Sequence, residues 1–148
     1  MKKILVFALA CLLSVGVTNA QKETKSDKSE VKEAQIVFDK TTHDFGTFSE
    51  SDPVVSCTFT FTNEGSAPLV IHQAIASCGC TVPTYTRMPI KPGEQGKIDI
   101  TYNGHGKYPG RFKKSITVRT NSKEPMVRLY VTGNMTEAGK DEPVAEKE

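Results

Sequence analysis

The sequence predicts an all-β fold, an immunoglobulin-like antiparallel β-sandwich of about seven to eight short strands. Apolar and polar residues alternate over several short segments, which is the period of a half-buried strand. Turn sequences rich in Gly, Asn and Pro separate these segments. Prolines recur from residue 53 to residue 125 and leave little room for a long helix. Short alternating strands with frequent turns are typical of a sandwich.

The strands are predicted from alternation. Four segments alternate clearly: 53–63, 97–102, 111–120 and 126–133. In the first of these, Phe59 and Phe61 share a face with Cys57, and threonines occupy the other face. Residues 35–39 and 43–48 predict a short, kinked first strand. Residues 69–77 are apolar at both parities, which predicts a central strand or one with a bulge.

Two turns have clear local chemistry. Residues 63–66, Asn-Glu-Gly-Ser, predict a hairpin in which Gly65 takes a positive φ. Residues 91–94, Lys-Pro-Gly-Glu, predict a β-turn in which Pro92 presets φ and Gly93 takes the left-handed position.

The domain organisation has four predicted parts. Residues 1–20 combine Lys2 and Lys3 with an apolar run and a small-residue cleavage site, and they predict a secretory signal peptide. Residues 21–35 predict a flexible charged linker, residues 36–135 the sandwich domain, and residues 136–148 a disordered acidic tail. The apolar run is short for a membrane span, so no transmembrane segment is expected after cleavage. Lipidation at Cys11 is the alternative to cleavage after Ala20.

The charge balance gives no argument for nucleic-acid binding. The formal net charge is +2, and removal of Lys2 and Lys3 with the signal peptide brings it to zero. Basic residues are nevertheless concentrated between Arg87 and Arg128, with ten Lys or Arg against three Asp or Glu. A solvated lysine-rich surface is the favoured interpretation and a polyanion site around Tyr108, Arg111, Lys113 and Lys114 is the alternative.

The number of cysteines indicates an exported domain in which disulfides do not pair every cysteine. Cleavage leaves Cys57, Cys78 and Cys80, and an odd number means that at least one thiol is free, metal-bound or paired between molecules. Cys57 is predicted to be a small buried hydrophobic residue.

The segment Cys78-Gly79-Cys80 is the main chemical candidate, and three interpretations remain open. A structural role at a strand end is favoured, in which Gly79 is needed for a tight bend and a Cys78–Cys80 disulfide is a further option. Thiol–disulfide exchange is the second interpretation, because a bridge over one residue would be easily reduced. The third is a soft-metal site for copper or zinc, with Cys78, Cys80 and His72 as ligands and with Met88 and His105 as further candidates.

Catalytic machinery is not predicted, and no cofactor is expected. His43-Asp44 resembles part of a dyad, but no nucleophile motif accompanies it, and a turn hydrogen bond from Asp44 is the favoured role. Glycines in residues 104–110 are not followed by a predicted helix that could hold phosphate.

An ordered set of segments resembles a known family. These segments are HDFGTF, FTNEGSAPLVI, SCGCTVP, IKPGEQGKIDITYN, GRFKKSITVRTN and LYVTGN. They resemble the secreted bacterial family catalogued as domain of unknown function 1573, which is similar to Hydin-like and major-sperm-protein-like immunoglobulin-like domains. The resemblance covers about residues 36–135, matches at Cys78 to Thr81, and assigns no role to Cys57. It implies the fold and export but no reaction.

The leading functional hypothesis is therefore an exported, non-enzymatic binding or structural module in the periplasm or on the cell surface. Its expected partner is an unknown protein or cell-envelope component, met at sheet edges and loops. Soft-metal binding or thiol–disulfide exchange at the Cys-Gly-Cys segment is the alternative.

Overall fold

The computed structural model describes residues 32–139. The predicted signal peptide, most of the predicted linker and most of the predicted tail lie outside these residues. The described chain forms eight strands: β1 (Ile36–Phe38), β2 (Thr42–Ser49), β3 (Val54–Asn63), β4 (Ile71–Ala76), β5 (Thr81–Tyr85), β6 (Gln95–Asn103), β7 (Gly110–Thr120) and β8 (Met126–Thr136). Among the described residues, no helix is long and apolar enough to cross a membrane.

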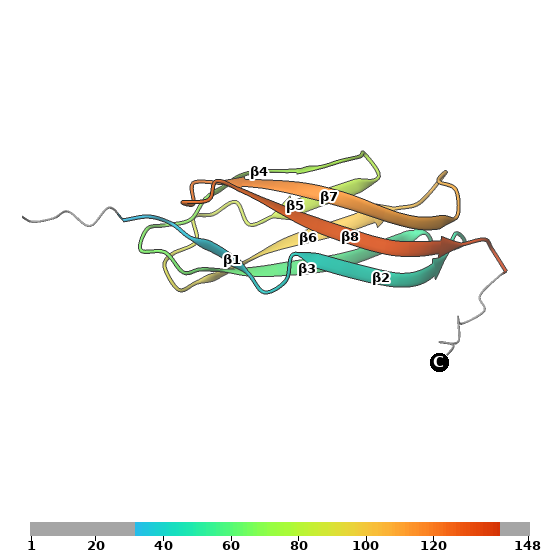
Figure 1. Cartoon of the computed structure of the whole chain (residues 1–148), viewed down its shortest axis with the longest axis horizontal. Coiled ribbons are helices and arrows are strands. Elements are labelled where there is room, and N and C mark those ends of the chain that lie inside the picture. Colours follow the sequence, from blue (N-terminus) through green and yellow to red (C-terminus); the bar gives the residue numbers. More distant parts are fainter. Residues whose placement is uncertain (1–31, 140–148) are drawn as a thin grey trace, which may run out of the picture. The chain divides into compact units, whose positions relative to one another are not determined.

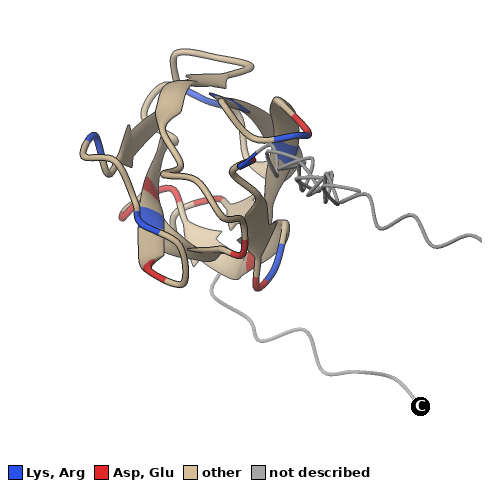
Figure 2. Ribbon diagram, turned by 90° about the vertical axis from the view of Figure 1, so that its left-hand side faces the viewer, with Lys and Arg blue, Asp and Glu red and all other residues tan. Residues whose placement is uncertain are grey.

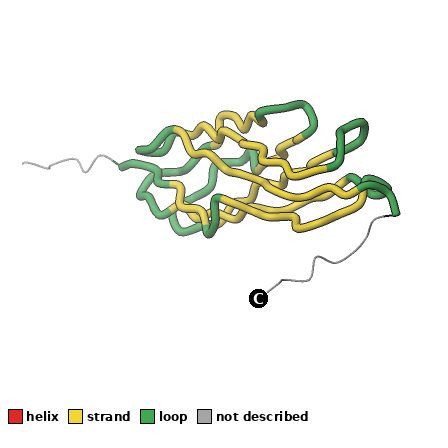
Figure 3. The backbone as a smooth tube through the Cα atoms, turned by 45° about the vertical axis from the view of Figure 1, so that its right-hand side comes forward, coloured by secondary structure: helices red, strands yellow, loops and turns green. Residues whose placement is uncertain are grey.

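The strands form two four-stranded sheets that pack face to face (Figure 1). The first sheet has the order β1-β3-β6-β5 and the second the order β2-β8-β7-β4. This arrangement matches the constant-type immunoglobulin sandwich with a divided first strand. The predicted all-β sandwich is thus confirmed, and the loops gather at the ends of the strands (Figure 3). One pairing departs from the antiparallel prediction, because β2 runs parallel to β8.

The predicted kinked first strand is two strands in different sheets. β1 pairs with β3 in the first sheet, and β2 pairs with β8 in the second. The chain changes sheets over residues 39–41. Packing also begins before the predicted domain boundary at residue 36, because Ala34 is buried and bridges to Ser122.

The prediction of a hairpin at residues 63–66 is wrong. β3 and β4 belong to different sheets, so this segment is a crossover. Gly65 does not have a positive φ. It is a close-approach glycine instead: a Cβ there would lie 2.3 Å from the carbonyl oxygen of Glu33 and 2.5 Å from the amide nitrogen of Gln35. The turn at residues 91–94 is confirmed, with Gly93 at φ 78° and the Glu94 amide donating to the Lys91 carbonyl at 3.0 Å.

The segment of ambiguous parity, 69–77, forms an edge strand rather than a central one. β4 pairs only with β7 in its sheet and contains a bulge between Ile71 and Gln73. Of the two alternatives predicted for this segment, a central strand or a strand with a bulge, the bulge is therefore confirmed. β5 was not predicted from sequence, because Pro83 lies in the middle of this strand. Proline is tolerated there because β5 is an edge strand.

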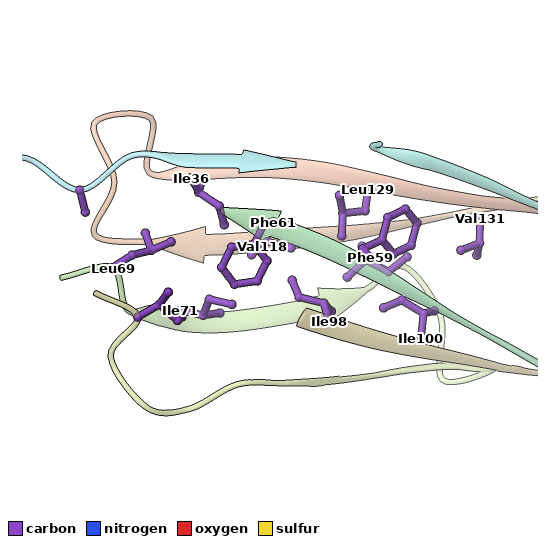
Figure 4. Close-up of a cluster of buried hydrophobic side chains, with 13 residues drawn as sticks. Ile36, Phe59, Phe61, Leu69, Ile71, Ile98, Ile100, Val118, Leu129 and Val131 are labelled. Atoms are coloured by element: carbon purple, nitrogen blue, oxygen red, sulfur yellow. The ribbon is translucent and has the colours of Figure 1, made fainter. Parts of the chain in front are cut away.

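The core lies between the sheets and contains the predicted inward faces (Figure 4). Phe59, Phe61, Ile98 and Ile100 from the first sheet are fully buried against residues such as Leu129 from the second. The β3 and β6 residues lie side by side on the inner face of the first sheet because Phe59 pairs with Ile98 in the ladder. Strands with a period of two therefore supply both halves of the core.

Candidate functional site

The Cys-Gly-Cys segment forms the turn between β4 and β5, which are edge strands of different sheets. The Thr81 amide donates to the Cys78 carbonyl at 3.2 Å, which closes the turn. The Asn103 amide, at the end of β6, donates to the Cys80 carbonyl at 2.8 Å. The Ser77 amide donates to the Ser115 carbonyl of β7 at 2.8 Å. The turn is therefore attached to both sheets by backbone hydrogen bonds.

The two sulfur atoms of this turn lie within bonding distance. The Cα atoms of Cys78 and Cys80 are 5.3 Å apart, which is inside the normal range for a disulfide. Cys80 is buried and Cys78 is half-buried. The expectation that the bend requires glycine is wrong, because Gly79 has no positive φ and a Cβ there would meet nothing within 4 Å.

The predicted metal ligand His72 does not join the cysteines. It lies at the bulge that opens β4, and this bulge cancels the even spacing that would have put it on the face of Cys78. Their separation of six positions corresponds to roughly 20 Å of strand. Within residues 32–139, no group of three or more His, Cys, Asp or Glu side chains gathers closely enough to hold a metal ion. The ligand set of Cys78, Cys80 and His72 is not assembled.

Cys57 lies apart from the pair, on the inward face of β3. It is half-buried, packs against the core and is free. Burial raises the pKa of its thiol to about 11. A thiol in this state is a poor nucleophile at neutral pH, because the thiolate is the reactive form.

His43 and Asp44 point to opposite sides of β2 and form no dyad. The His43 ring packs inward, 4.9 Å from the ring of Phe45, and burial lowers its pKa. Asp44 is exposed and accepts a hydrogen bond from the Gly46 amide at 3.0 Å. The turn role predicted for Asp44 is confirmed.

A second candidate site was not predicted from sequence. It is a slot of about 550 Å³ between β1 and the first half of β8. Its walls include Ile36, Val37 and Phe38 from β1 and Val127 from β8, with Lys123 and Glu124 at one end. The slot exists because β2 begins beside Tyr130, so residues 126–129 of β8 have no neighbouring strand on that side. Figure 1 shows that β2 starts partway along β8.

Hydrogen bonds close both ends of this slot. At one end the Lys123 amide donates to the Ala34 carbonyl at 3.1 Å. At the other end the Tyr130 amide donates to the Thr41 carbonyl at 2.8 Å. Backbone groups alternate in direction along a strand. The backbone groups of Arg128 and Met126 therefore point to the same side as those of Tyr130, into the slot.

The sequence comparisons identify a family but no characterised relative. Residues 36–135 match the model of the family described as a protein of unknown function, DUF1573. No curated protein matches the chain.

Several solved structures are similar to this chain in fold. A protein of unknown function from Porphyromonas gingivalis W83 is similar, with a TM-score of 0.60 and 18% identity over 70% of this chain and 47% of that one. The ASH/PapD-like domain 7 of human CEP192 has a TM-score of 0.58 and 12% identity over 90% of this chain and 99% of that domain.

The VesB protease of Vibrio cholerae is also similar, with a TM-score of 0.53 and 14% identity over 68% of this chain and 31% of that protein. The chain spans about half or less of the two bacterial proteins. Identities this low indicate the fold alone. From the family match over residues 36–135, the chain belongs to the DUF1573 family and has an immunoglobulin-like, PapD-like β-sandwich.

Proposed function

We propose that this protein is an exported, non-enzymatic binding module that captures an extended segment of another cell-envelope protein. The captured segment adds as a strand beside residues 126–129 of β8, in the slot next to β1. Strand addition uses main-chain hydrogen bonds for affinity and side-chain pockets for specificity. The open edge of β8 is the observation that carries this proposal.

The dimensions and lining of the slot suit a short strand. The edge without a neighbour runs from Met126 to Leu129, because β2 pairs with β8 only from Tyr130 onward. The slot holds about 550 Å³, and its mixed lining includes the apolar side chains of Val37, Phe38 and Val127. A segment with small apolar side chains at alternate positions would bury these side chains against the walls while its backbone bonds to β8.

Export is supported by the predicted signal peptide of residues 1–20, with its basic start, apolar run and small-residue cleavage site. A non-enzymatic role is supported by the separation of the reactive side chains. His43 and Asp44 lie on opposite faces of β2, and burial holds the Cys57 thiol in its protonated form near neutral pH.

The test separates the backbone of Arg128 from its side chain. Arg128→Pro removes the amide that points into the slot and leaves the β7 ladder intact, because proline is tolerated where the amide faces away from a neighbour. Arg128→Ala is the matched control, since it removes the side chain and keeps the amide. Short peptides selected from a displayed library on the full chain are the probes, and fluorescence polarisation measures their affinity.

We expect peptides that bind the wild-type protein to bind Arg128→Ala with similar affinity and Arg128→Pro at least about tenfold more weakly. Amide exchange at residues 126 and 128 should also slow when peptide is present. Selection of no peptide, or equal binding to the two variants, would reject strand addition at this edge.

A further inference from the structure

The outer face of the second sheet carries an excess of positive charge. Side chains of alternate residues in β7 and β8 point to solvent, and four of them are basic: Arg111, Lys113, Arg119 and Arg128. The ladder aligns them on one surface, because Arg111 pairs with Asn134, Lys113 with Thr132 and Thr117 with Arg128. These basic residues lie within strands, and Figure 2 shows basic positions on strands as well as on loops.

The cations of this face are not neutralised by neighbours. In the described part of the chain, ion pairs join Lys91 to Glu94 and Lys97 to Asp99, and neither pair lies on this face. Asp44, on the neighbouring strand β2, carries a carboxylate and lies opposite Thr132 of β8. One of its oxygens already accepts the Gly46 amide. The first sheet differs, since Lys97 of its outer face has Asp99 as a partner at 3.9 Å.

Neutral polar and aromatic groups lie between the cations. Tyr130 is near the middle of the face, and the Lys113 ammonium lies 4.5 Å from the centre of its ring. Ser115 and Thr117 occupy the outward positions of β7 between Lys113 and Arg119. Hydroxyl groups can both donate and accept hydrogen bonds. The face therefore offers partners for the hydroxyl groups of a ligand as well as for its charges.

Two hollows mark the ends of this face. One, of about 450 Å³, lies over β2, β8 and β7 and is lined by Arg111, Thr47, Thr132, Asn134 and the carboxylate-bearing Asp44 among others. The other, also of about 450 Å³, lies by β4 and β7 and is lined by Arg119, Gln73 and Met126 among others. The two arginines are eight positions apart along β7, which corresponds to roughly 27 Å of strand.

We infer that this face binds an anionic polysaccharide, one that carries carboxylate, sulfate or phosphate groups. The chain of sugars would run along β7 from one hollow to the other. Its anionic groups would meet Arg111, Lys113 and Arg119, and its hydroxyl groups would meet the polar side chains between them. A planar guanidinium group suits carboxylate, sulfate and phosphate because it donates two parallel hydrogen bonds.

The composition of the face favours a polysaccharide over a lipid surface or a nucleic acid. Membrane-surface binding requires a continuous apolar face beside the cations. Here the exposed apolar side chains Ile75 and Met126 lie on separate strands, and Ser115, Thr117 and Thr132 lie between the cations. A nucleic-acid strand needs several aromatic platforms for its bases, and Tyr130 is the aromatic residue among the outward positions of β7 and β8. This inference is independent of the proposed strand addition, which uses the backbone of β8.

The experiment is affinity electrophoresis of the full chain in gels that contain polygalacturonate, heparin or neutral dextran. The test variant is Arg111→Ser, Lys113→Ser and Arg119→Ser. The control variant is Lys91→Ser, Lys97→Ser and Lys107→Ser, which removes the same charge elsewhere. Arg128 is left unchanged, so a failure here is distinct from a failure of the peptide experiment.

We expect both anionic polymers to retard the wild-type protein and dextran not to do so. The test variant should bind about tenfold more weakly or worse, and the control variant about as well as wild type. Binding should also weaken as salt is raised. The inference is overturned if neither anionic polymer retards the protein or if the two variants lose binding equally. Tighter binding to single-stranded DNA or to anionic lipid vesicles than to the polysaccharides would also overturn it.

Discussion

At the scale of single residues, Gly65 illustrates a role that local sequence does not reveal. The backbone of residues 33–35 passes directly over this glycine, and a Cβ would lie 2.3 Å from the Glu33 carbonyl oxygen. The amides of Ser66 and Ala67 both donate to that carbonyl, at 2.8 and 3.2 Å. The contact attaches the start of the domain to the β3–β4 crossover.

We predict that Gly65→Ala destabilises the protein by about 1–3 kcal/mol, because the added methyl group collides with backbone that cannot move aside. Gly79→Ala is the matched control, since it meets open space at an ordinary φ and should be neutral or slightly stabilising. Urea unfolding of both variants measures the difference. Equal midpoints for the two variants would contradict the role given to Gly65.

At the scale of elements, Asn63 joins the end of β3 to three other segments. Its side chain is fully buried, and its amide nitrogen donates to the carbonyls of Ala67 and Ile90 at 2.8 and 2.9 Å. Its oxygen accepts the amides of Gly65 and Gln35 at 3.0 and 3.3 Å. One side chain therefore bonds to four backbone groups that lie outside the eight strands.

We predict that Asn63→Ala lowers the free energy of unfolding by about 2–4 kcal/mol, because several buried backbone groups lose their partners together. Asn103→Ala is the control. Its oxygen accepts a single bond in an exposed turn, from the His105 amide at 2.9 Å, so its loss should cost about 1 kcal/mol or less. Chemical denaturation with both variants tests this, and similar losses would show that Asn63 has no special linking role.

At the scale of the whole molecule, the core rather than the Cys78–Cys80 turn holds the sheets together. The core cluster draws buried side chains from both sheets, including Phe59, Ile98, Ile116 and Leu129. A bridge between residues separated by two positions closes a very short loop. The chain-entropy relation gives such a bridge only about 1.5 kcal/mol.

We predict that the Cys78→Ser, Cys80→Ser double variant stays folded and loses about 1–2 kcal/mol. Intact mass of the protein from cells, alkylated under denaturing conditions without reductant, is the companion measurement. It should show a chain that begins at Gln21, carries one adduct on Cys57 and lacks two hydrogens. Three adducts would mean that the pair is reduced, and collapse of the fold in the double variant would contradict the dominance of the core.

The sequence by itself determined the class of fold, the inward faces of the main strands and the turn at Gly93. These features depend on a period of two residues and on local backbone preferences, which are readable without knowledge of partners. It also located the Cys-Gly-Cys segment at the end of a strand. The signal peptide stays a prediction.

Only the tertiary structure decided which strands lie at the edges and what the loops contact. The division of the first strand between two sheets creates the slot, because it leaves β8 without a neighbour before Tyr130. The pairing of β7 with β8 aligns Arg128 with the cations of β7. The pairing of β4 with β7 contains a bulge that sets His72 apart from Cys78. Such features depend on which segments pair and in what register, and contacts between residues far apart in the chain decide both.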